Sequence, residues 1–90
     1  MMSENKPHSP ILVERVQTGV RLEKRLLKVL KAVAELNDMS LGDLLEGVVL
    51  HAFEGKCAFS AESVAVIAQF TDLYGLQLRA ADSHALKEAP

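Results

Sequence analysis

A seven-residue stretch early in the chain alternates apolar and polar side chains, and no similar stretch lies near it in the sequence. One face carries Val16, Thr18, Val20 and Leu22, and the opposite face carries Gln17, Gly19 and Arg21. A period of two with β-branched residues on one side predicts a half-buried strand. A lone strand leaves its backbone N–H and C=O groups without partners. We therefore expect the second strand to come from another copy of the chain.

After this stretch the pattern changes to the period of a helix. From Leu22 to Leu36, apolar residues recur every three or four positions, with lysines and arginines off the stripe. Asn37 and Asp38 then predict a turn, because both residue types tolerate left-handed backbone. The sequence therefore predicts an amphipathic helix directly after the strand.

A second helix is predicted from Ser40 to Gly55. Ser40 with Asp43 three residues later has the form of a capping box, and Gly55 suits a left-handed stop. The apolar stripe follows helical spacing almost without exception: Leu41, Leu44, Leu45, Val48, Val49, Ala52 and Phe53.

A third helix is predicted over Ser60–Tyr74, with Ser60 as N-cap and Gly75 as stop. Its apolar residues cover more than one face, and such a helix is usually buried from several directions. This again favours packing between chains. Residues 79–90 show no sustained pattern and are expected to be frayed.

Composition sets the class of protein. At 90 residues with 49% hydrophobic and 24% charged residues, one globular domain is expected. The single cysteine, Cys57, excludes an intrachain disulfide and fits a reducing compartment. The first ten residues contain no apolar signal core, and no apolar run approaches the length of a membrane helix. We therefore expect a cytoplasmic protein that does not bind membranes.

The net charge of −2 conceals an asymmetry. Residues 1–31 contain seven Lys or Arg against three Asp or Glu, whereas residues 32–53 contain four acidic residues and no Lys or Arg. A basic segment of this kind can attract anions even in an acidic protein. A solvated helix face is the plainer interpretation of the same charges.

The order strand, helix, short turn, helix over Arg15–Glu54 resembles the ribbon-helix-helix family of DNA-binding proteins. The resemblance implies a mainly α homodimer in which two strands pair in trans and four helices enclose a shared core, here extended by a C-terminal helix. It divides the chain into an arm (1–14), a ribbon-helix-helix domain (15–55), a helical extension (56–78) and a tail (79–90). The dimer core that it implies consists of Val16, Val20, Leu22, Leu26, Val33, Leu45, Val48 and Val49.

The resemblance also implies where DNA would bind. A two-stranded ribbon fits the major groove, so the outward residues Gln17, Gly19 and Arg21 would meet base edges. The start of the second helix would hold a phosphate through its free N–H groups and dipole. The predicted phosphate contacts are Arg15, Lys24, Arg25, Ser40, Leu41 and Gly42. The expected function is a sequence-specific transcriptional repressor or plasmid-maintenance protein.

Several residues depart from the family pattern. Gly19 offers no side chain at the centre of the base-reading face. Glu23 stands where Pro or a small polar residue is commoner, and Asp38 replaces the usual glycine of the turn. Asp43 and Glu46 place negative charge near the predicted phosphate anchor and oppose phosphate binding there.

The sequence contains no clear motif for a metal site or for catalysis. His8, His51 and His84 are scattered, and His51 and Cys57 lack a second pair at zinc-ligand spacing. No phosphate-binding glycine loop, nucleophile elbow or carboxylate pair is visible. We therefore expect no enzyme activity, no metal and no cofactor.

Two alternatives remain open at this stage. The chain could use the dimer as a scaffold while the segment Phe59–Leu78 binds a partner protein, as antitoxins of similar design do. Alternatively, Val16–Leu22 is not a strand and the protein is a three-helix bundle. For the main interpretation the expected assembly is a homodimer, or a tetramer of two dimers, bound to double-stranded DNA.

Overall fold

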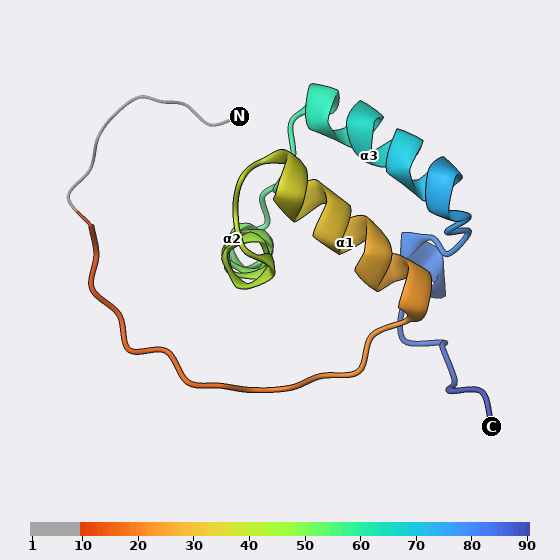
Figure 1. Ribbon diagram of the computed structural model, residues 1–90, viewed down its shortest axis with the longest axis horizontal. Helices are drawn as coiled ribbons and strands as arrows, with labels where there is room; N and C mark the ends of the chain where they lie inside the picture. The colour runs from red at the N-terminus through yellow and green to blue at the C-terminus, as the bar shows by residue number, and fades with distance from the viewer. Residues whose placement is uncertain (1–9) are drawn as a thin grey trace.

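The computed structural model describes residues 10–90, so most of the predicted arm over residues 1–14 lies outside the described residues. Three α-helices follow in order: α1 (Lys24–Leu36), α2 (Leu41–Phe53) and α3 (Ala61–Tyr74). A single 3₁₀ turn, η1 (Ala80–Asp82), completes the secondary structure of this part of the chain. In Figure 1, α1 lies in the middle and packs against both α2 and α3. The protein is mainly α, as the sequence predicted.

The first helix begins two residues later than predicted, at Lys24. The Glu23 carboxylate acts as its cap by accepting a hydrogen bond from the Leu26 N–H at 2.8 Å. Glu23 therefore caps α1 with its side chain. At the other end, the Asn37 amide donates to the Val33 carbonyl at 2.8 Å, and Asp38 adopts a φ of 55°. The predicted left-handed turn is confirmed.

The predicted caps of the other two helices are also confirmed. Ser40 Oγ accepts from the Asp43 N–H, and Ser60 Oγ accepts from the Ser63 N–H, both at 3.1 Å. Gly75 ends α3 with a φ of 70°. Gly55 follows α2 with a φ of 71°. Only glycine reaches this region without steric cost, so both helices end where the sequence contains one.

The hydrophobic core of the single chain is small. Within residues 10–90 only Val29, Val33, Ala34 and Leu44 are buried. They come from α1 and α2, and half-buried side chains from α3 and the loops complete the cluster. Small domains already bury a low fraction of their surface, and a core of four residues is a weak source of stability. The apolar residues left outside it are available to a second chain.

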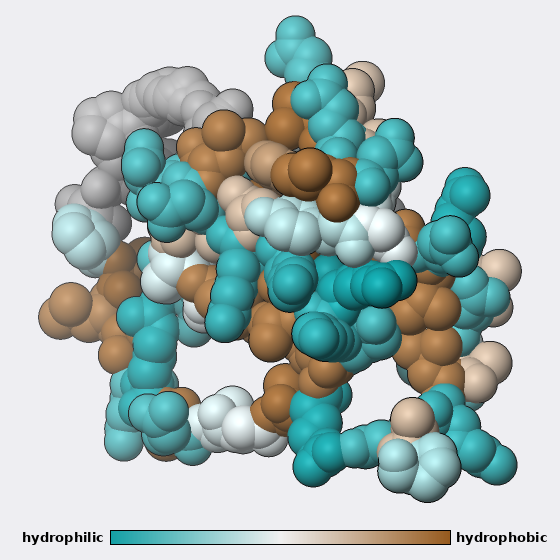
Figure 2. Space-filling view, turned by 45° about the vertical axis from the view of Figure 1, so that its right-hand side comes forward, coloured by the Kyte–Doolittle hydropathy of each residue, from teal (hydrophilic) through white to brown (hydrophobic). Residues whose placement is uncertain are grey.

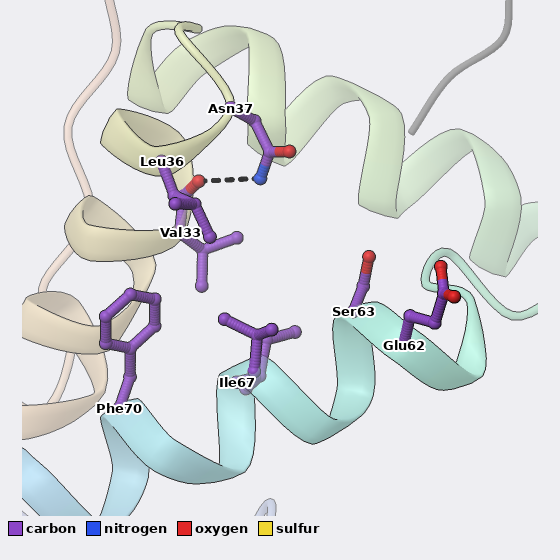
Figure 3. Close-up of a pocket in the computed structure, with 8 residues that line it drawn as sticks. Val33, Leu36, Asn37, Glu62, Ser63, Ile67 and Phe70 are labelled. Atoms are coloured by element: carbon purple, nitrogen blue, oxygen red, sulfur yellow. Dashed lines mark hydrogen bonds between the residues drawn. The ribbon is translucent and has the colours of Figure 1, made fainter.

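Helix α3 covers α1 with one face. Figure 3 shows Ile67 and Phe70 of α3 pointing toward Val33 of α1, around a hollow of about 120 Å³. The flanks of α3 stay partly open, with Val64 50% and Leu73 72% exposed on opposite sides of the helix. The expectation that α3 is buried from several directions therefore does not hold within one chain, because α1 is the only helix of residues 10–90 against which it packs.

Residues 10–23 form a long open trace that runs outside the helices (Figure 1). No strand occurs within residues 10–90, and the backbone of residues 10–22 makes no hydrogen bond to other described backbone groups. Val16 is 81% and Val20 73% exposed. The predicted strand Val16–Leu22 does not form among the described residues of a single chain, since a strand requires a neighbour that residues 10–90 do not supply.

Apolar side chains reach the surface in several separate patches (Figure 2). The largest exposed apolar residues on the helices are Leu36, Val49, Leu50, Phe53, Val64 and Leu73. On the extended segment they are Ile11, Leu12, Val13, Val16, Val20 and Leu22. None of the helices in residues 10–90 has the length and apolar character that crossing a bilayer requires.

Candidate nucleic-acid interface

The three residues predicted to read bases lie on the extended segment. Gln17, Gly19 and Arg21 are all exposed, and no atom lies within 4 Å of where a Cβ on Gly19 would stand. The Arg21 guanidinium pairs with the carboxylate of Glu88 near the C-terminus. Gln17 and Gly19 make no side-chain contact of this kind among the described residues and are open to solvent.

The predicted phosphate anchor lies at the start of α2. Ser40 is the N-cap, and its hydroxyl takes up the N–H of Asp43. The first N–H groups of any helix have no partner within the helix, which leaves those of Leu41 and Gly42 for an external acceptor. Gly42 is exposed, and a Cβ there would meet only Ser40 Oγ, at 3.9 Å. An oxyanion can therefore approach this backbone closely.

Arg15 lies against the same helix. Its Nε and Nη2 atoms donate to the two carboxylate oxygens of Glu46, each at 2.8 Å, and Nη2 lies 3.6 Å from Asp43 Oδ1. The hydrogen bond from Arg15, together with its positive charge, lowers the pKa of Glu46 below its ordinary value. The hydrogen bond to Glu46, followed by the charges of Glu46 and Asp43, raises the pKa of Arg15.

Arg21, Lys24 and Arg25 line a second region, an open hollow of about 800 Å³ between the start of α1 and residues 75–78 and 86–89. Arg25 donates to the Gly75 carbonyl at 3.2 Å, which joins the start of α1 to the end of α3. Lys24 is exposed and makes no ion pair within residues 10–90. The structure thus divides the predicted cations into two groups, Arg15 at α2 and the other three around this hollow.

The residues predicted for the dimer core take different positions in the single chain. Val33 is buried, whereas Leu26, Leu45 and Val48 are half-buried. The exposed members of the set are Val16, Val20, Leu22 and Val49. Only half of the set is therefore covered without a second chain.

Asp43 and Glu46, expected from the sequence to oppose phosphate binding, are instead the partners of Arg15. The signal was present in the charge segregation, because a basic N-terminal part and an acidic second helix attract each other. The Arg21–Glu88 contact had no comparable signal, since the two residues are 67 positions apart.

Residues that could carry other chemistry are engaged locally. The His51 Nδ1 atom lies 2.7 Å from the Gly47 carbonyl, and the exposed thiol of Cys57 donates to the Phe59 carbonyl at 3.1 Å. Across residues 10–90, no three His, Cys, Asp or Glu side chains are grouped so that they could hold a metal ion.

Comparison with known proteins finds no family model that matches the chain, no characterised protein that matches its sequence and no solved structure that matches its fold.

Proposed function

We propose that this protein is a homodimeric, sequence-specific DNA-binding regulator that inserts a two-stranded ribbon into the major groove. The observation that carries the proposal is the state of residues 10–23. They are exposed, residues 10–22 have no backbone hydrogen-bond partner among the described residues, and the segment leads directly into the helix pair α1–α2. A segment with an apolar face and unpaired backbone groups is stabilised by a copy of itself.

The dimer would bury the apolar side of this segment. Val16 and Val20 would pack over the exposed apolar residues of α2, among them Val49. Burial contributes about 25 cal/mol per Å² of apolar surface, so the small core of one chain gains most from covering these residues. The mainly α protein would then be a ribbon-helix-helix dimer with α3 as an additional helix.

The polar side of the ribbon would read DNA. A glutamine pairs bidentately with adenine and an arginine with guanine, and each good pair discriminates against the wrong base by about 1–3 kcal/mol. Gln17 and Arg21 carry this role, and Gly19 lets the backbone approach the base edges. The N–H groups of Leu41 and Gly42 would hold a phosphate and fix the register of the ribbon.

The experiment is a selection from a randomised duplex pool with the purified full chain, followed by titration of the selected duplex. Arg21→Ala is expected to lose specificity at one base position and about tenfold or more in affinity. Lys31→Ala is the matched control, because Lys31 is an exposed cation on α1 outside the proposed interface. Failure to enrich any sequence, or equal losses in the two variants, would count against the function.

A protein-interaction scaffold is the second candidate, and the exposed apolar residues of α3 favour it. Val64 is 50% and Leu73 72% exposed within residues 10–90. Crosslinking in cell extract distinguishes the two functions. Recovery of one stoichiometric partner, lost in Leu73→Asp, supports the scaffold, whereas recovery of the protein alone contradicts it.

A further inference from the structure

Arg15 was predicted to contact phosphate, yet it is the most fully engaged cation of the proposed interface. Both of its interacting nitrogens face Glu46 at 2.8 Å, which is the bidentate geometry that an arginine adopts with a single carboxylate. Asp43 lies 3.6 Å from the same guanidinium. Lys24, by contrast, makes no ion pair among the described residues. The charge of Lys24 is therefore available to a DNA phosphate, whereas the charge of Arg15 is already engaged by carboxylates.

We propose that Arg15 is a positioning residue, which offsets one of the two negative charges of Asp43 and Glu46 beside the phosphate anchor and fixes the start of the ribbon on α2, and does not itself bind DNA phosphate. The inference rests on the proposed function and deepens it. It also accounts for the acidic residues that depart from the family pattern, because their charge is compensated from within the chain.

The location of the three residues supports this role. Asp43 is in the first turn of α2, on the helix whose free N–H groups would hold the phosphate, and Glu46 is one turn further. An uncompensated carboxylate at this end would repel a phosphate over several ångströms, since the Debye length in physiological salt is about 8 Å. With Arg15 in place the net charge of the trio falls from two negative charges to one.

The pair also connects two parts of the chain that share few other contacts. Arg15 is near the beginning of the predicted strand, and Glu46 is 31 residues further along, on α2. The orientation of the ribbon relative to the phosphate anchor decides whether both reach DNA at once. A bidentate pair of hydrogen bonds restricts this orientation better than a single hydrogen bond does.

The first test needs no DNA. The pKa of the Glu46 carboxyl is measured by NMR titration of the full chain, in the wild type and in Arg15→Gln. The proposal predicts a low pKa in the wild type that rises toward the ordinary value in the variant. An unchanged pKa means that the pair does not form in solution and overturns the proposal.

The second test measures affinity for a mixed-sequence DNA duplex as a function of salt. Arg15→Gln is expected to weaken binding about fivefold at low salt, and the added substitution Glu46→Gln is expected to recover most of the loss. Arg15→Gln with Glu62→Gln is the matched control. It restores the same net charge at an exposed residue of α3 that makes no ion pair among the described residues, and it should recover little.

The salt slope separates a positioning residue from a DNA ligand. Each phosphate neutralised adds about 0.9 to the slope of log affinity against log salt. Lys24→Gln should therefore lower the slope by about this amount whether or not Glu46 is also changed, whereas Arg15→Gln with Glu46→Gln should keep the wild-type slope. A lower slope in Arg15→Gln, without recovery by Glu46→Gln, makes Arg15 a phosphate ligand and overturns the proposal while the DNA-binding function stands. Absence of duplex binding by the wild type overturns both.

Discussion

Residues 10–23 expose their apolar side chains, whereas the three helices α1–α3 (the helical body) bury part of theirs. In the body, the α1 residues Val29 and Val33 are covered by α2, α3 and the loops. In the extended segment, every residue from Pro10 to Glu23 is exposed, although its apolar alternation is as regular as that of the helices. The difference teaches that helices satisfy their backbone within themselves, whereas a strand depends on a neighbour. One chain therefore completes the helices α1–α3, whereas residues 10–23 form no secondary structure in it.

The first prediction tests whether residues 10–23 of two chains pair with each other. We expect Val20→Asp to weaken self-association about a thousandfold, because each dimer would bury two carboxylates without partners. Sedimentation equilibrium over a range of concentrations measures this effect. Gln17→Asp adds the same charge on the opposite face and should leave association nearly unchanged. A wild-type protein that is monomeric at micromolar concentration would refute the ribbon.

Substitutions in the core of the helical body should instead lower the free energy of unfolding of the single chain. Leu44→Ala is expected to lower the free energy of unfolding by about 3 kcal/mol, because Leu44 is only 6% exposed and its removal leaves a cavity between α2 and α1. Urea denaturation measures the change. Leu50→Ala on the same helix, where the side chain is 63% exposed, serves as control and should cost far less. Equal costs would mean that the second chain, and not α1, is the main partner of α2.

The two serine caps distinguish local stability from function. Ser40→Ala and Ser60→Ala should each lower the free energy of unfolding by about 1 kcal/mol, because each hydroxyl accepts one backbone N–H at a helix start. Only Ser40→Ala should also weaken duplex DNA binding beyond what its stability loss explains. Thermal unfolding and DNA titration of the two variants provide the check. Equal DNA affinities would remove the start of α2 from the interface.

The features that could be predicted from the sequence are those that depend on neighbouring residues. The caps at Ser40 and Ser60 and the stop at Gly75 depend on residues within one helical turn, so their pattern can be recognised directly. The strand predicted over Val16–Leu22 from its period of two does not form within residues 10–90 and stays a prediction that depends on a second chain. The contacts of the candidate site were not foreseen, because Arg15 and Glu46 are brought together by the fold across 31 positions. The one-sided burial of α3 depends on which helices surround it, which composition alone does not state.

The smallest expected effect concerns the pH dependence of the Arg15–Glu46 contact. Because the pKa of Glu46 is lowered from its ordinary 4.5 in the folded chain, the contact stabilises the protein above that pH. This contribution should decline as the pH falls from 4.5 through the lowered folded-state pKa, since protonation removes the charge that Arg15 binds. Both side chains are well exposed, so the contribution is small and should shrink further in concentrated salt.

The measurement is the difference in free energy of unfolding between wild type and Glu46→Gln at neutral and acidic pH, with Glu62→Gln as control. A difference that persists at acidic pH would show that Glu46 acts through packing and not through its charge, and the extended segment would then have no electrostatic tie to the helical body at this position.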